Sequence, residues 1–129
     1  MKKLLFILPA LALAACAPAQ GAKPLVYQGE SGAILAAAAQ LCPTLQAGKN
    51  TNYFSVVSVT PTTVVCTTTP TPFFAALVGN ITITLTLTAL PNGNTTTVAG
   101  SEDWGKAAPN TDALLALYAG LDRKFTRLP

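Results

Sequence analysis

The sequence contains no histidine, and only 10% of its 129 residues are charged. Histidine is the usual general base, the commonest metal ligand and the side chain that titrates near neutral pH. Its absence excludes Ser-His-Asp and Cys-His catalysis by this chain alone. We therefore expect neither a catalytic residue nor an enzymatic function.

The charge that is present gives little support for an electrostatic partner. The formal net charge of +3 includes Lys2 and Lys3, and the rest of the chain carries six basic and five acidic side chains. A nucleic-acid-binding protein needs a basic face, so we expect no nucleic-acid partner. Half of the residues are apolar, which predicts a folded chain rather than a disordered one. The length suits one domain with a modest core.

The first fifteen residues form an apolar leader. Lys2 and Lys3 precede an uncharged apolar run over residues 4–15. This run is shorter than the roughly 20 residues that a membrane-spanning helix requires. A basic start, a short apolar run and small residues at its end are typical of a secretory signal. The alternative is a buried helix of the domain itself.

The leader ends in Leu13-Ala14-Ala15-Cys16, which resembles the lipobox of bacterial lipoproteins. The resemblance implies a diacylglyceryl group on the Cys16 thiol, cleavage before Cys16 and acylation of the new amino terminus. A cysteine is required because its thiolate is the nucleophile that takes the lipid. Apart from this lipid, we expect no cofactor. Cleavage after Ala17 or Ala19, giving a soluble secreted protein, is the alternative.

The resemblance divides the chain into a signal peptide (1–15), a lipidated cysteine with a tether (16–24) and one domain (25–129). It places the domain outside the cytoplasm, in the bacterial cell envelope, with the membrane as a partner through the lipid. Ala17 stands where many inner-membrane lipoproteins have aspartate. Outer-membrane sorting is therefore favoured if the cell has two membranes.

Within the domain, periodicity predicts two helices and four main strands. Apolar spacing predicts a helix that ends near Leu41 or Cys42, with Ser31 as its N-cap, and a second helix that is capped by Asn110 or Thr111. The apolar stripe of the second helix comprises Leu114, Leu117, Tyr118, Leu121, Phe125 and Leu128. Residues 53–60, 63–69, 81–89 and 95–100 have strand composition, residues 25–27 suit a further edge-like strand, and the form of residues 73–78 is undecided.

This order of elements predicts an α+β fold, with a four-stranded antiparallel sheet and two helices packed on one face as a two-layer sandwich. It is similar to that of helix-grip envelope lipoproteins, such as those attached to outer-membrane assembly machinery. The similarity rests on element order alone, and a fold does not determine a function.

Cys42 and Cys66 form an even pair in an exported protein, which favours a disulfide. Two free buried thiols are the alternative. Two cysteines without histidine do not supply the four ligands of a structural zinc site, and we expect no metal.

Two polar features are candidates for binding. Glu102, Asp103 and Trp104 form the loop where we expect any local site, although a surface turn explains them more simply. The threonines that alternate over residues 81–89 suggest surface binding, but they come from one strand, so a solvated sheet face is the simpler interpretation. The leading hypothesis is a non-enzymatic binding or structural module with an envelope protein as partner. The alternative is a small-ligand carrier or enzyme with a pocket between helices and sheet.

Overall fold

The computed structural model describes residues 20–105, 107 and 110–129, which form an antiparallel sheet with three helices. Six strands lie in the order β3-β4-β5-β6-β2-β7, and β1 also pairs with β6. The strands are β1 (Gln20–Gly21), β2 (Leu25–Gln28), β3 (Ser55–Val59), β4 (Thr63–Thr68), β5 (Ile83–Asn92), β6 (Thr95–Asp103) and β7 (Arg127–Leu128). The helices are α2 (Ser31–Leu41), α3 (Pro72–Val78) and α4 (Asp112–Asp122), with a 3₁₀ turn at Cys42–Thr44.

The hairpin of β5 and β6 is the centre of the sheet. β5 is the longest strand, and its alternating apolar and threonine residues place a buried row on one face and a partly exposed row on the other. Gly93, in the turn, has a φ of 64°, a conformation that glycine adopts without strain. The register runs without a break from Thr84 opposite Asp103 to Asn92 opposite Thr95.

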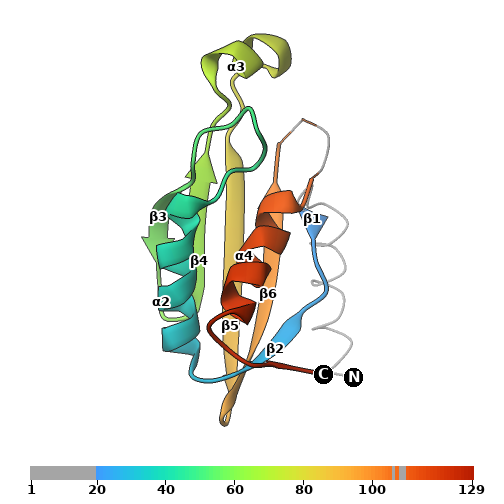
Figure 1. Ribbon diagram of the computed structural model, residues 1–129. Helices are drawn as coiled ribbons and strands as arrows, with labels where there is room; N and C mark the ends of the chain where they lie inside the picture. The colour runs from blue at the N-terminus through green and yellow to red at the C-terminus, as the bar shows by residue number, and fades with distance from the viewer. Residues whose placement is uncertain (1–19, 106, 108–109) are drawn as a thin grey trace, which may run out of the picture.

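Helices α2 and α4 cover one face of this sheet (Figure 1). Their buried side chains meet the buried face of β4, β5 and β6. This core includes Ile34, Leu35, Val64, Ile83, Leu85, Leu87, Val98, Leu114, Leu117 and Leu121. The helices approach closely at Gly120, where a Cβ atom would lie 2.8 Å from Leu41 Cδ1.

The predicted four-stranded sheet with two helices is wrong. Besides the four main strands and the edge-like strand expected at residues 25–27, the sheet contains β1 and β7, and residues 72–78 form a third helix. Strands β1, β2 and β7 have two to four residues each, which is too short for a reliable alternation pattern. Their pairing comes from tertiary contact with β6 and with each other.

Both ends of the described chain differ from expectation. Gln20 and Gly21, which were expected in a tether, pair with Glu102 and Ser101 of β6. At the other end, α4 stops at Asp122, so Phe125 and Leu128 do not extend its apolar stripe. The last residues turn back as β7 and pair with β2.

The N-cap of α2 differs from the expected one, whereas that of α4 does not. Glu30, and not Ser31, is the N-cap of α2 and makes no side-chain capping bond. Thr111, one of the two expected residues, is the N-cap of α4; its side chain makes no capping bond, but the Asn110 side-chain oxygen accepts a hydrogen bond from the Asp112 amide at 2.7 Å.

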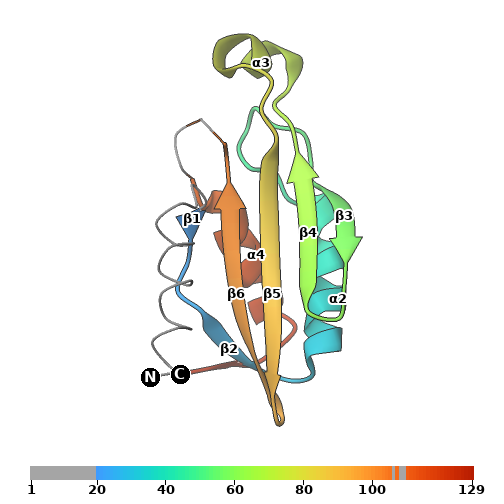
Figure 2. The ribbon, with the colours of Figure 1, turned by 180° about the vertical axis from the view of Figure 1, so that it is seen from behind.

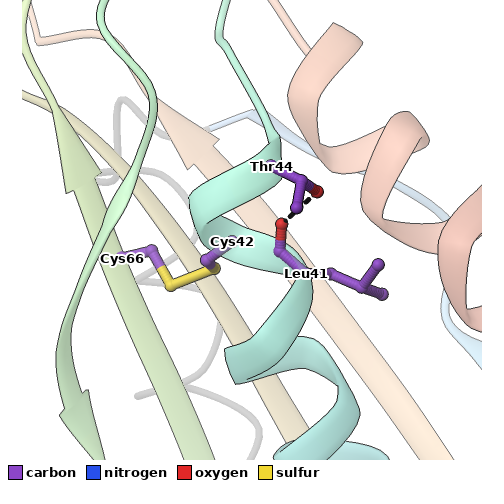
Figure 3. The surroundings of a disulfide bond; sticks show 4 residues. All are labelled: Leu41, Cys42, Thr44 and Cys66. Carbon is purple, nitrogen blue, oxygen red and sulfur yellow. Dashed lines mark hydrogen bonds between the residues drawn. A yellow bond between two sulfur atoms is a disulfide. The ribbon is translucent and has the colours of Figure 1, made fainter.

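A disulfide joins Cys42, just after α2, to Cys66 on β4 (Figure 3). Both residues are buried, and their Cα atoms are 6.5 Å apart. Thr44 Oγ1 donates a hydrogen bond to the Leu41 carbonyl at 2.6 Å, closing the 3₁₀ turn that carries Cys42. The bond therefore fixes the end of α2 to the sheet.

Helix α3 lies outside these layers, beyond the end of the sheet, between β4 and β5 (Figures 1 and 2). The described residues include no helix with the length and apolar character needed to cross a membrane.

Candidate functional site

Glu102 lies at the α3 end of the sheet, with its side chain on the helix-covered face of β6. It has no exposed surface. Its Oε1 accepts a hydrogen bond from the Leu114 amide at 2.9 Å, and its Oε2 accepts one from Trp104 Nε1 at 2.8 Å. Leu114 is in the first turn of α4, where amides have no partner within the helix. A carboxylate from the sheet therefore caps α4 and also holds the indole.

Burial raises the pKa of Glu102, because an ionised carboxylate loses its hydration there. Its hydrogen bonds with the backbone of Leu114 and the side chain of Trp104 act in the opposite direction, and the net direction is upward. Both carboxylate oxygens are occupied by groups of the protein. This arrangement is that of a structural acid.

Asp103 does not join Glu102 in a paired site. Successive strand residues point to opposite faces, so the two carboxylates lie on different sides of β6. Asp103 Oδ1 accepts a hydrogen bond from the Gly105 amide at 2.8 Å, which closes the turn after the strand. Of the expected binding loop, Trp104 is the residue that lines a pocket.

This pocket, the tip pocket, has a volume of about 340 Å³ and lies between α3, the 47–51 loop and Trp104. It is lined by Ala47, Gly48, Lys49, Asn50, Thr51, Phe74, Val78, Trp104, Ala107 and Asn110. Its aromatic and aliphatic groups suit an apolar ligand, and Lys49 is the charged residue among the described residues of its lining. The size and chemistry are those of a site for a small apolar group.

The wall of the tip pocket is held by a buried threonine. Thr51 Oγ1 accepts hydrogen bonds from the amides of Ala47 and Gly48 at 3.0 and 3.2 Å. The Asn50 carbonyl accepts hydrogen bonds from both the amide and the hydroxyl of Thr71, the N-cap of α3. The loop and the helix are thus fixed to each other at the pocket.

The second candidate surface is the sheet face opposite α2 and α4. Figure 2 shows β4, β5 and β6 from this side, with α2 and α4 behind them. Register aligns Thr63 with Thr88 and Thr67 with Thr84. We call this surface the open face; its central positions are Thr63, Val65, Thr67, Thr84, Thr86, Thr88, Thr97, Ala99 and Ser101.

Regularly spaced threonines are not confined to one strand, contrary to what the sequence alone indicated. Neighbouring strands contribute hydroxyls next to those of β5, and its central positions carry no charge. Among the described residues, no helix covers it, and its side chains are partly exposed.

A polar cluster at the opposite end of α4 has a structural role. Tyr27 is fully buried, and its hydroxyl donates a hydrogen bond to Asp122 Oδ1 at 2.7 Å. Burial and this bond raise the pKa of Tyr27. Burial by itself would raise the pKa of Asp122, but hydrogen bonds from Tyr27 and Arg127 hold it below its usual value. The cluster connects β2, α4 and β7.

Cys16, the predicted lipidation site, lies outside the described residues. Within the described part of the chain, no group of three or more Cys, Asp or Glu side chains is placed to hold a metal ion. Sequence reasoning missed Phe74, Val78 and Lys49 as pocket residues, because their segments meet only in three dimensions. One signal was present: no charged residue occurs between Lys49 and Glu102.

Comparison of the chain with protein-family models, curated proteins and solved structures gave no significant match.

Proposed function

We propose that the protein is a lipid-anchored protein of the bacterial cell envelope whose domain is a non-enzymatic binding module. The lipobox-like Leu13–Cys16 supports the anchor. The Cys42–Cys66 disulfide supports export, because such bonds form and persist in oxidising compartments. Ala17 after the lipidated cysteine favours the outer membrane.

The observation that carries the non-enzymatic role is the separation of Glu102 from Asp103. These adjacent carboxylates were the candidates for acid–base chemistry. The structure directs them to opposite faces and uses both Glu102 oxygens to hold α4 and Trp104. We assign the open face as the surface that binds an envelope protein. Its hydroxyl and methyl groups are uncharged, so contact with a partner would not bury an unpaired charge.

Site-specific photocrosslinking in the membrane-anchored protein tests this role. A photoreactive residue in place of Thr86 samples the open face, and one in place of the exposed Gln40 of α2 is the matched control. We expect a discrete crosslink to an envelope protein from position 86 and none from position 40. Equal labelling from both positions, or none from position 86, contradicts the assignment.

The tip pocket favours a second candidate, a carrier of small apolar ligands. Trp104 is the only tryptophan, so its emission reports directly on occupancy of this pocket. Titration with an alkyl or aryl carboxylate should shift this emission, with Lys49 facing the carboxylate. A Phe74→Ala variant should weaken the response. An unchanged spectrum across both ligand classes contradicts the carrier.

A further inference from the structure

Helix α3 exposes an unusual amount of apolar surface for its length. Its sequence, PFFAALV, has no polar side chain, and none of its seven residues is buried. Phe73 is 77% exposed and Leu77, one helical turn later, is 71% exposed. A helix on the surface of a soluble domain normally turns a polar face outward. Contiguous exposed apolar groups mark a contact with a membrane or another protein.

The position of α3 is fixed despite this exposure. Hydrogen bonds from Thr71 to the Asn50 carbonyl hold its start, and Phe74 packs partly against the core. Hollows flank the helix, the tip pocket on one side and a cleft of about 810 Å³ on the other. Phe73 and Leu77 are therefore presented outward from a defined place at one end of the sheet.

The chain enters the sheet from this same end. Strand β1 is antiparallel to β6, with Gln20 opposite Glu102 and Gly21 opposite Ser101. Followed toward the N-terminus, β1 thus runs in the direction of Asp103, the end of β6 nearest α3. Glu102 is in turn opposite Leu85, two residues after the start of β5. Gln20 is therefore close to the α3 end, about 10 Å across two strand spacings from β5.

The predicted lipid site is within reach of the same end. Cys16 precedes Gln20 by four residues, which span at most about 14 Å. An acyl chain on Cys16 would hold this end of the domain against the membrane, where Phe73 and Leu77 project. Residues 50–101, which include α3, contain no Asp, Glu, Lys or Arg, so insertion of α3 would not bury a charged side chain of this segment in the membrane. Lys49, at the tip pocket, suits the anionic headgroups beside such a contact.

We propose that α3 is a second membrane contact, with Phe73 and Leu77 inserted into the interface of the bilayer that holds the Cys16 lipid. This inference rests on the proposed lipid anchor. The acyl chains on Cys16 would attach the chain to the bilayer, and the α3 contact would fix the orientation of the domain on it. The contact would stand the sheet on the membrane, with the hairpin at Gly93 farthest from it and the open face accessible from the side.

Quenching by brominated lipids tests the contact. Leu77→Trp adds to Trp104 a second tryptophan, which lies on α3. Leu90→Trp adds one instead near the end of β5 that is farther from α3, also at an exposed apolar residue. Each full mature protein is reconstituted in phosphatidylethanolamine–phosphatidylglycerol vesicles with brominated or plain acyl chains. Subtracting the wild-type Trp104 signal isolates the added emission. We expect a blue-shifted, strongly quenched signal from position 77 and little quenching from position 90.

The outcomes separate the contact from the anchor. The mass of each reconstituted protein shows whether Cys16 carries lipid. Lipidated protein without quenching at position 77, or with equal quenching at both positions, overturns the α3 contact and leaves the anchor standing. Protein without lipid contradicts the anchor. In that case the unlipidated protein is mixed with the brominated vesicles. Quenching at position 77 then supports the α3 contact, and the absence of quenching overturns it. Burial of position 77 against a protein, detected as a blue shift without quenching, also overturns it.

Discussion

Replacing Glu102 by alanine should destabilise the fold far more than its position beside a surface loop suggests. The change removes the carboxylate that accepts hydrogen bonds from the Leu114 amide and from Trp104 Nε1, and Glu102 itself has no exposed surface. A buried donor left without a partner costs about 1–3 kcal/mol, so two such donors predict a loss of about 2–6 kcal/mol. This is a large share of the 5–15 kcal/mol that stabilises a typical domain.

Denaturant unfolding followed by far-ultraviolet circular dichroism measures this loss. Asp103→Ala is the matched control, because it removes the neighbouring carboxylate and its single, exposed hydrogen bond to the Gly105 amide. The control should lose no more than about 1 kcal/mol, the net value of one ordinary hydrogen bond. Equal losses for the two variants, or less than about 1 kcal/mol for Glu102→Ala, would refute the capping role.

The same residue predicts a pH dependence with a definite sign. Because the folded-state pKa of Glu102 is raised, the folded protein holds the proton more tightly than the unfolded chain does. Wild-type stability should fall as pH rises from the unfolded value, about 4.3, through the raised pKa. Glu102→Ala lacks this dependence, so the stability difference between the two proteins should shrink across that interval. A difference that grows with pH contradicts the raised pKa.

Three further changes test the core. Joint replacement of Cys42 and Cys66 by alanine should cost about 3 kcal/mol by the loop-closure estimate, measured by denaturant unfolding against the oxidised protein; an unchanged midpoint contradicts this. Gly100→Ala would place a Cβ atom 2.4 Å from Leu114 Cδ1. The resulting overpacking should lower the free energy of unfolding by about 1–3 kcal/mol in the same assay. A gain in stability would be inconsistent with the close approach of α4 to β6. Burial and a carboxylate partner raise the pKa of Tyr27. Wild-type protein should therefore lose stability above about pH 10, where an unfolded tyrosine ionises, and Tyr27→Phe should lose less. Parallel curves of stability against pH for the two proteins would contradict the raised pKa.

Strong local patterns predicted the central elements, and tertiary contacts determined the rest. Nine alternating residues identified β5, and apolar spacing identified α2. The short strands β1 and β7 have two residues each and no such pattern, and their place in the sheet follows from pairing with β6 and β2. The predicted sheet was therefore too small.

The binding surfaces could be predicted only in part. Glu102, Asp103 and Trp104 were identified as a local group, but the strand alternation that separates the two carboxylates depends on β6 extending to Asp103. The open face depends on the register between strands, which no single strand reveals. The exposure of α3 depends on its place beyond the sheet, although its uncharged composition was visible in the sequence.

Intact mass measurement of the protein extracted from membranes is the sharpest test of the lipid anchor. We expect a chain that begins at Cys16 and carries the added mass of a diacylglyceryl group, with acylation of the amino terminus. Cys16→Ser should abolish this added mass and the lipid labelling, and should release the chain from the membrane fraction. An unmodified chain that begins after Ala17 or Ala19, or lipid labelling that persists in Cys16→Ser, would contradict the anchor.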